Sequence, residues 1–339
     1  MPTPHVLVLT QPGDTHAAAV TRHLERTGTR VTVFDPAEFP SAATLSLHLT
    51  PTGAARRTLG RGTDRVDLDT VDAVWFRRPQ DPRAHAEVTD PAVREYVEQE
   101  CELFAGALWD DLDALAVPGT RADIRLAGRK QTQLRLAGRL GFELPPTLVT
   151  TDPDEFLDFW DGHEGRVITK PLQRSWLVRG DESYARMAET ATTVDVAAAD
   201  ALRLCPVIAQ AYVDKRVELR VTVVGGAVFA AEIHSQDSNH TRLDWRCYDQ
   251  STTRYGVHSL PVDVERRCLR LVAELGLRYG AIDLIVTPDG RYVFLEINPS
   301  GQWLWIEDAT GLPISAALAD LLRSGADRHL PRPVIGAQP

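Results

Sequence analysis

Two acidic residues and one asparagine lie in apolar stretches near the end of the chain. Residues 281–286 are apolar except for Asp283, and residues 292–297 are mainly apolar but include Glu296, with Asn298 directly after them. An acidic side chain inside an apolar strand is costly to bury unless it is paired or bound to a metal ion. Two carboxylates and an amide oxygen are hard ligands of the kind that Mg²⁺ prefers. These residues therefore predict a magnesium site, provided that the strands bring them together.

The turn between the two stretches decides whether the carboxylates meet. A two-residue turn at Asp289-Gly290 places Asp283 directly opposite Glu296, with Cβ atoms about 5 Å apart, and puts Asn298 on the same face. The proline before this turn equally suits a longer turn with a glycine bulge, which shifts the register by one residue and separates the carboxylates. Unrelated acids on one exposed face of the sheet are the alternative to a metal site.

Lysine is rare in this chain. Of its 37 basic residues only three are lysines, Lys130, Lys170 and Lys215. A lysine that persists where arginine is otherwise used indicates a place that needs a compact ammonium group and not a planar guanidinium. Chance in an arginine-biased composition is the alternative. The local context favours a site for Lys130, in a predicted helix, and for Lys170, near the end of a predicted strand.

Two charged residues lie inside a predicted hairpin at 217–233, whose turn is Gly225-Gly226. Glu218 and Arg220 are two positions apart and therefore share one face of their strand. Because a strand interior prefers Val, Ile or Thr, these two charges serve either a site or a solvated face.

The elements that position these residues begin with an α/β unit. Apolar runs and turn signals predict helices at 15–27 and 91–108, and strands at 5–10, 30–35, 73–76 and 115–119. The strand–helix–strand order predicts a parallel sheet. The predicted fold class is therefore α/β, with α+β elements in the remainder of the chain.

The rest of the chain becomes strand-rich towards its end. A predicted helix at 121–140 carries Lys130 and ends at Gly141. A strand at 165–172 carries Lys170, and the polar residues 173–180 after it are interpreted as a loop. The other predicted elements are strands at 147–150, 207–213, 281–286 and 292–297, and helices at 152–160, 263–275 and 314–322.

Composition and missing motifs exclude several classes of protein. The net charge of -10 argues against a nucleic-acid binder, and no apolar run approaches the ~20 residues that span a bilayer. The first residues do not form a secretory signal, and the four cysteines show neither metal-ligand nor redox spacing. We therefore expect a cytoplasmic protein with reduced thiols, whose partners are neither nucleic acid nor membrane. The sequence also has no nucleophile elbow, P-loop, dinucleotide fingerprint or helical His-x-x-x-His pair.

The late apolar stretches resemble a known signature. Residues 283–286 together with 295–302 are similar to the metal-binding signature of ATP-grasp ligases. The resemblance implies ATP held between two antiparallel sheets, and Mg²⁺ as a cofactor, with two ions and with Mn²⁺ as a substitute. It also implies an N-terminal parallel α/β domain at 1–119, a central domain at 120–208, a C-terminal antiparallel-sheet domain at 209–325 and a tail at 326–339.

The same resemblance implies contacts to the phosphates, residue by residue. Lys130 and Lys170 match the two lysines that hold the nucleotide phosphates, and residues 173–180 match the flexible lid, although they contain fewer glycines. Arg246 matches the arginine that approaches the γ-phosphate or the acyl phosphate. Lys170, Arg220 and Arg246 form the implied catalytic set.

Base, ribose and metal contacts are implied in the same way. The segment matching the adenine hinge, which binds the base through its backbone, consists of Gln210, Ala211, Tyr212 and Val213. Glu218 matches the acid that contacts the ribose hydroxyls. The implied metal ligands are Asp283, Glu296 and Asn298.

A narrower resemblance comes from three short motifs: residues 75–79, Ser235-Gln236, and 244–246 with the sequence Asp-Trp-Arg. Together they are similar to graspetide (microviridin-type) ligases, the maturases of ribosomally made precursor peptides. This implies activation of Asp or Glu side chains of a precursor peptide with a leader segment, closure of ester or amide rings, and a homodimeric enzyme. Arg77 and Arg78 are then either anchors for an acidic substrate side chain or structural salt-bridge partners.

Two other functions stay open. The chain could be an ATP-grasp ligase that adds an amino acid to a small acid or a protein C-terminus, as glutathione synthetase and glutamate ligases do. ATP consumption stimulated by a free amino acid, and not by an acidic peptide, would favour it. The chain could also be a nucleotide-dependent peptide-binding module without turnover, in which Asp283→Asn would leave function intact.

Overall fold

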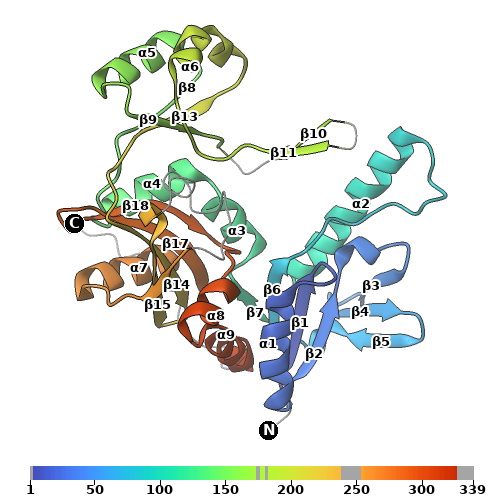
Figure 1. Ribbon diagram of the computed structural model, residues 1–339. Coiled ribbons are helices and arrows are strands. Elements are labelled where there is room, and N and C mark those ends of the chain that lie inside the picture. Colours follow the sequence, from blue (N-terminus) through green and yellow to red (C-terminus); the bar gives the residue numbers. More distant parts are fainter. Residues whose placement is uncertain (1–2, 173–175, 180–181, 238–252, 327–339) are drawn as a thin grey trace.

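A four-stranded parallel sheet forms the centre of the N-terminal part of the chain (Figure 1). The computed structural model describes residues 3–172, 176–179, 182–237 and 253–326. In sheet order, the strands are β2 Arg30–Phe34, β1 His5–Thr10, β6 Ala73–Arg78 and β7 Leu115–Val117. The connecting helices are α1 Thr15–Arg26 and α2 Pro91–Asp110. All neighbouring strands are parallel, so the predicted α/β unit is confirmed.

Aspartate side chains begin both helices of this unit. The Asp14 carboxylate accepts hydrogen bonds from the backbone N–H groups of His16 and Ala17, at 2.8 and 3.0 Å. Asp90 caps α2 in the same way, and Pro91 occupies the first helical position. Both arrangements satisfy N–H groups that have no partner inside the helix.

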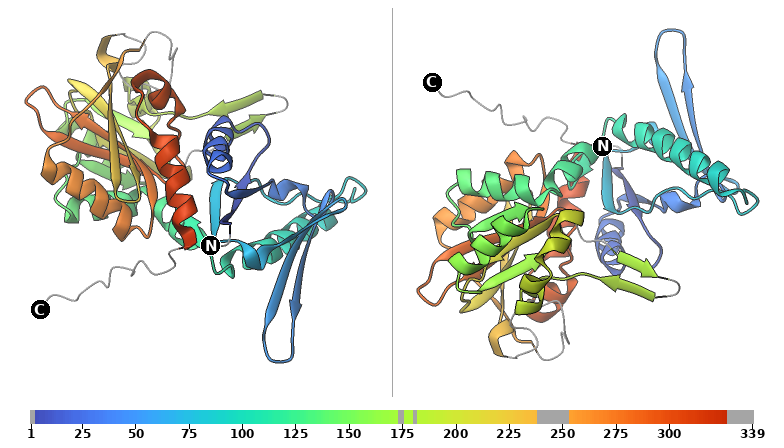
Figure 2. Two further views of the ribbon diagram at one scale, coloured as in Figure 1. Left: turned by 90° about the horizontal axis from the view of Figure 1, so that it is seen from below. Right: turned by 90° about the horizontal axis from the view of Figure 1, so that it is seen from above.

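A three-stranded antiparallel sheet extends from the same domain and was not predicted (Figure 2). Its strands are β3 Ala43–Leu49, β4 Ala55–Arg61 and β5 Asp64–Asp67, and the short 3₁₀ helices η1 Pro36–Glu38 and η2 Leu68–Thr70 flank it. Leu45 and Leu59 pack with Phe34 in the domain core. In β3 the apolar residues Ala43, Leu45, Leu47 and Leu49 alternate with polar ones, a strand signal that was overlooked. The strands β4 and β5 are mostly polar and lack such a pattern.

The predicted helix at 121–140 is wrong in one respect, because it is broken into α3 Arg121–Ala127 and α4 Lys130–Arg139. The break lies at Gly128, a poor helix former, and at Arg129, whose backbone is extended. Lys130 is therefore the first residue of α4 and does not lie inside a continuous helix.

The central part of the chain is a second, smaller layer. Its antiparallel sheet contains, in order, β12 Glu189–Thr190, β9 Val167–Lys170, β13 Val207–Ala211 and β8 Thr147–Thr150. The helices α5 Pro153–Gly162, α6 Thr193–Ala197 and η3 Ala199–Leu204 cover it. The loop interpretation of 173–180 is wrong in part, because β10 Trp176–Arg179 pairs with β11 Glu182–Ala185 in a projecting hairpin (Figure 1).

The C-terminal part is a five-stranded antiparallel sheet. In order, its strands are β16 Tyr255–Val257, β15 Ala227–Ile233, β14 Val217–Val224, β17 Tyr279–Val286 and β18 Tyr292–Asn298. One face packs against α7 Val262–Glu274 and α4 around Leu219, Leu284 and Phe294. The remaining elements are η4 Ser235–Asp237, α8 Leu304–Thr310, α9 Ile314–Arg323 and η6 Ser324–Ala326.

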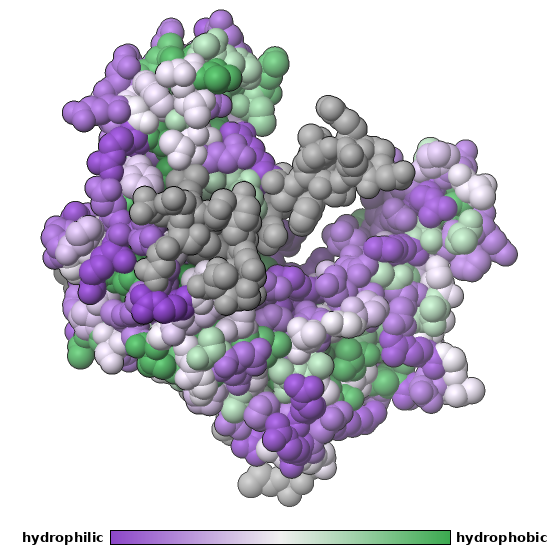
Figure 3. Space-filling view, viewed as in Figure 1, coloured by the Kyte–Doolittle hydropathy of each residue, from purple (hydrophilic) through white to green (hydrophobic). Residues whose placement is uncertain are grey.

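The N-terminal and C-terminal parts share a hydrophobic core. Helix α9 packs against α1, and Trp75 of β6 lies in one buried cluster with Tyr279 of β17 and Trp303. Hydrophilic residues predominate on the face in Figure 3. No helix in the described part of the chain is long and apolar enough to cross a membrane.

Candidate functional site

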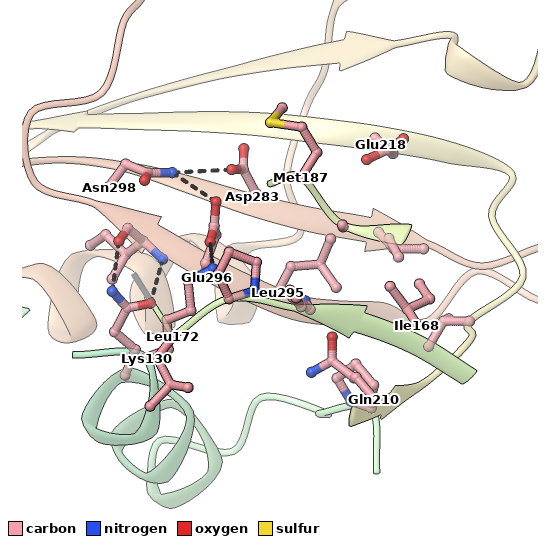
Figure 4. A pocket seen from close by; sticks show the side chains of 18 of the residues that line it. Lys130, Ile168, Leu172, Met187, Gln210, Glu218, Asp283, Leu295, Glu296 and Asn298 are labelled. Carbon is pink, nitrogen blue, oxygen red and sulfur yellow. Dashed lines mark hydrogen bonds and ion pairs between the residues drawn. The ribbon is translucent and has the colours of Figure 1, made fainter. Parts of the chain in front are cut away.

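A cavity of about 220 Å³ lies between the central sheet and the C-terminal sheet. Its lining comes from the start of α4, from β9 and β13 on one side, and from β14, β17 and β18 on the other. Figure 4 shows two ends: Asp283, Glu296, Asn298 and Lys130 lie together at one, and Gln210 lies at the other.

The three predicted metal ligands meet in this cavity. The Asn298 amide nitrogen lies 3.2 Å from Asp283 Oδ2 and 3.2 Å from Glu296 Oε1, and donates to both (Figure 4). All three side chains line the cavity, and Asp283 is buried. Turned over, the same amide would present its oxygen beside two carboxylates, a donor set that suits Mg²⁺.

A bulge in β18, and not a tight turn, brings the two carboxylates together. Near the turn, Leu284 pairs with Phe294, which is the register of the longer turn and would separate the acids. The register then shifts by one residue, so that Leu295 is the extra residue and Asp283 pairs with Glu296. The longer turn considered from the sequence does form, but the bulge reverses the one-residue shift in register that this turn causes. It also leaves both Leu295 and Glu296 lining the cavity.

A buried glutamine fixes helix α4 to strand β18, which carries two of the predicted metal ligands. The Gln133 side chain accepts a hydrogen bond from the Ile297 N–H at 3.1 Å and donates to the Ile297 carbonyl at 2.9 Å. This places Lys130 Nζ 3.2 Å from Glu296 Oε2. Gln133 was missed in the sequence, although a polar residue on the apolar face of a helix, three positions from Lys130, is a usable signal.

Arg220 lies beside the metal ligands. It pairs with Asp283 across β14 and β17, and its Nε is 3.2 Å from Asp283 Oδ1. Both side chains are buried, and the guanidinium lies over the ring of Trp305. Because Glu218 is buried as well, the solvated face considered for this pair is wrong.

Glu218, which lines the cavity, accepts two hydrogen bonds. Lys215 Nζ donates to its Oε1 at 3.0 Å, and the Ser235 hydroxyl donates to the same oxygen at 2.7 Å. The Lys215 side chain is only 3% exposed. The sequence assigned no role to Lys215, although the rarity of lysine was a signal, because Lys130, Lys170 and Lys215 all line the cavity.

Three of the four residues of the predicted adenine hinge, 210–213, line the cavity. Gln210, Ala211 and Val213 line the cavity, whereas Tyr212 donates its N–H to the Arg166 carbonyl and stacks on the Arg166 side chain. The Ala211 N–H donates to the Pro146 carbonyl at 2.9 Å. In an antiparallel pair the opposite residue would normally donate its own N–H to the Ala211 carbonyl. Because proline has no N–H, Pro146 makes no such bond, and the Ala211 carbonyl stays available to a donor from a ligand.

Arg77 lies outside the cavity and has structural partners. It is buried, with Nε 3.2 Å from Asp14 Oδ2 and Nη1 2.8 Å from the Ser300 carbonyl. Of the two interpretations of Arg77 made from the sequence, this geometry favours the salt bridge over the substrate anchor. Arg78, at the carboxyl end of β6, is half-buried and makes no ion pair with any residue in the described ranges.

Two predicted features lie beyond the residues that the structure describes. Arg246 and the motif at 244–246 fall outside the described residues, as do residues 173–175 and 180 of the predicted lid. Within the described ranges, no cluster of three or more His, Cys, Asp or Glu side chains could hold a metal ion. The candidate metal site is therefore the one built from two carboxylates and an amide.

Comparisons with known proteins agree with this geometry. Residues 5–121 match the family model of the MvdD pre-ATP-grasp domain. The structure of the macrocyclase MdnB from Microcystis aeruginosa MRC is 32% identical, with a TM-score of 0.78, over 94% of this chain and 99% of that one. The chain belongs to the RiPP-associated ATP-grasp ligases. No curated protein matches it.

Two further structures are similar to this ATP-grasp ligase. The ligase from Chryseobacterium gregarium, in complex with ADP and a leader and core peptide, is 29% identical, with a TM-score of 0.88 over 97% of this chain and 98% of that one. The macrocyclase MdnC, bound with precursor peptide MdnA from Microcystis aeruginosa MRC, is 29% identical, with a TM-score of 0.83 over 94% of this chain and 99% of that one. The predicted ATP-grasp fold is confirmed.

Proposed function

We propose that this ATP-grasp ligase uses ATP and Mg²⁺ to activate Asp or Glu side chains of a ribosomally made precursor peptide and closes ester or amide rings in it. The observation that carries the proposal is the convergence of three oxygen-bearing side chains and all three lysines on one cavity. Two of the similar structures support the peptide substrate, because one contains a leader and core peptide and the other a precursor peptide.

The proposed chemistry has two steps. A carboxylate oxygen of the peptide bonds to the γ-phosphorus of ATP, and the bond from that phosphorus to the ADP oxygen breaks. A hydroxyl or amine of the peptide then attacks the acyl carbon, loses its proton, and displaces inorganic phosphate. Mg²⁺ would supply charge neutralisation between the β- and γ-phosphates.

The residues have distinct roles in this proposal. Asp283, Glu296 and Asn298 would hold the metal ion, and Lys130 and Lys170 would hold phosphate oxygens as compact point charges. At the other end, the Ala211 carbonyl and the Val213 N–H would bind the adenine edge. Gln210 holds this hinge against β8, because its side-chain amide donates to the Thr147 hydroxyl at 2.9 Å.

Two arginines are proposed to receive the peptide carboxylate. Arg220 lies beside Asp283, and Arg78 is half-buried at the carboxyl end of β6. Arg246 is proposed as a further phosphate contact, as the family resemblance implies.

A mass measurement tests the proposal. The protein, ATP, Mg²⁺ and an acidic precursor peptide should give a product lighter by one water per ring, with release of ADP. Asp283→Asn should lose nearly all product, because a metal ligand is removed. Arg135→Met, on the exposed face of α4, is the control and should keep wild-type yield. An unchanged peptide mass under conditions where ATP is bound would exclude the maturase function.

The proposal also includes the finer details that the family resemblance implies. These are a homodimer, two metal ions at the site, and Mn²⁺ as a substitute for Mg²⁺. Light scattering of the purified protein tests the first, and metal titration of ADP release tests the other two.

A further inference from the structure

Arg77 of strand β6 makes buried contacts with the start of helix α1 and with the segment after β18. Its side chain, 2% exposed, forms an ion pair with Asp14, which also caps α1. On its other side it donates to the backbone carbonyl of Ser300, 223 residues away. A charged group so deeply buried is tolerated only where its partners are well placed. The N-terminal sheet and the segment after β18 are therefore held together here.

The segment that Arg77 contacts begins at a proposed metal ligand. Only Pro299 separates Asn298 from Ser300. The next residue, Gly301, receives a hydrogen bond on its carbonyl from the Tyr279 hydroxyl at 2.7 Å. A Cβ at Gly301 would lie 2.3 Å from the Cβ of Ala281, so this backbone lies directly against β17 and has no room to move towards it.

Trp303 anchors the other end of this segment. Its ring lies 4.5 Å from His16 and 5.6 Å from Tyr279, between ring centroids, and the Arg77 guanidinium lies over it at 5.2 Å. The indole N–H donates to the Ser315 hydroxyl at 2.9 Å. The residues after Asn298 are thus fixed at Ser300, Gly301 and Trp303, and Arg77 takes part in two of these contacts.

We propose that Arg77 is a positioning residue through which the N-terminal domain sets the affinity of the metal site. Groups that orient metal ligands typically change metal affinity about 10–100-fold when removed. Arg77 acts on Asn298 through the backbone of Ser300, so it needs no contact with metal, nucleotide or peptide. This inference rests on the proposed metal site, and it replaces a substrate-anchoring role for Arg77 with one that is independent of substrate.

The test measures metal affinity without turnover. Mn²⁺ binding in the presence of ADP is followed by electron paramagnetic resonance, with no peptide present. Arg77→Met should weaken Mn²⁺ binding about tenfold, while ADP binding in the presence of EDTA should stay unchanged. Arg77→Lys should restore part of the affinity, because a cation can still donate to the Ser300 carbonyl.

A matched control shows whether removing any buried, ion-paired arginine of the N-terminal domain weakens Mn²⁺ binding. Arg57 also lies in the N-terminal domain, has a side chain only 15% exposed, and pairs with Asp69 and Asp111. Its strand, β4, lies away from β18 (Figure 1). Arg57→Met should leave Mn²⁺ affinity unchanged. Tyr279→Phe, which removes only the hydrogen bond to the Gly301 carbonyl, should weaken Mn²⁺ binding in the same direction and decides the matter if Arg77→Met fails to fold.

The possible results distinguish two failures. If the wild type binds Mn²⁺ but Arg77→Met and Tyr279→Phe bind it equally well, the metal site stands and the positioning role is excluded. If the wild type binds no Mn²⁺ with ADP, the proposed metal site itself is wrong and the inference falls with it. A separate peptide titration adds to the first case: lost peptide affinity in Arg77→Met, with Mn²⁺ affinity unchanged, would return Arg77 to a substrate-binding role.

Discussion

The carboxylate of Glu218 is held by a cation and a hydroxyl before any ligand arrives. Lys215 and Ser235 both donate to its Oε1, which leaves Oε2 as the oxygen for a ligand. A hydrogen bond to a charged group contributes about 1.5–3 kcal/mol, and removing one partner of a buried ion pair leaves the other charge uncompensated. This orientation is consistent with the proposed contact between Glu218 and the ribose hydroxyls.

Replacing Lys215 should therefore weaken nucleotide binding more than it slows the chemical step. We expect Lys215→Met to raise the KM for ATP at least about tenfold, since about 1.4 kcal/mol corresponds to a factor of ten. The kcat should change less, because the metal ligands lie at the other end of the cavity (Figure 4). ADP release measured against ATP concentration checks this. A fall in kcat at constant KM would contradict it.

At the scale of residues, the sequence predicted side chains whose chemistry conflicts with their surroundings. Asp283, Glu296 and Glu218 were recognisable because acids are costly inside apolar strands. Arg77 was left between two interpretations, because its partners Asp14 and Ser300 come from opposite ends of the chain. Gln133 was missed because its partner is the backbone of Ile297, 164 residues away. Local patterns can mark a residue as unusual, but they do not name a partner so far away in the sequence.

At the scale of elements, β8 and β13 shape the proposed base-binding edge through one proline. Pro146 accepts a hydrogen bond from Ala211 but cannot return one. A strand with any other residue there could satisfy the Ala211 carbonyl internally. The absence of that donor is the basis for proposing the Ala211 carbonyl, at the end of β13, as the acceptor for the amino group of adenine.

Supplying the missing donor should reduce the preference for adenine. We expect Pro146→Ala to lower kcat/KM for ATP about threefold or more, the effect of one hydrogen bond of about 0.5–1.5 kcal/mol, and to lower the preference for ATP over GTP. Pro153→Ala, in the first turn of α5, is the control proline. An unchanged ratio of the two kcat/KM values would exclude the Ala211 carbonyl as an adenine contact.

Most elements were predictable, and the exceptions have local physical causes. The strands and helices of the N-terminal parallel unit and the hairpin of β14 and β15 follow from apolar periodicity and turn residues. The bulge at Leu295 was not predicted, because it is imposed by pairing with β17 and has no mark in the sequence of β18. Helix α8 was missed as well, since its seven residues are too few for a periodic pattern.

At the scale of the whole molecule, the domain junction contains a histidine that is kept neutral. Burial is the main cause that lowers the pKa of His16, to about 4, and the positive charges of Arg77 and Arg78 lower it further while Asp14 opposes them. His16 Nδ1 has no hydrogen-bond partner among the described residues. A charged imidazole is therefore disfavoured against the Trp303 ring.

This depressed pKa predicts a loss of stability in mild acid. An unfolded chain protonates His16 below pH 6.5, whereas the folded chain does so only near pH 4, so the free energy of unfolding falls as the pH drops between these values. The loss attributable to His16 should reach about 2 kcal/mol at pH 5, at about 1.4 kcal/mol per unit. Urea unfolding at pH 7.5 and 5 checks this. His16→Phe should lose less than the wild type, and equal losses would contradict the assignment.

Because all three lysines line one cavity, chemical labelling of lysine can report whether a nucleotide occupies that cavity. Apart from the α-amino group, an acylating reagent selective for amines has no side chain to modify elsewhere on the chain. The decrease in the number of labels on adding nucleotide would then count the accessible lysines that the nucleotide shields. Saturation could be followed by intact mass alone, without radiolabel, digestion or an engineered probe.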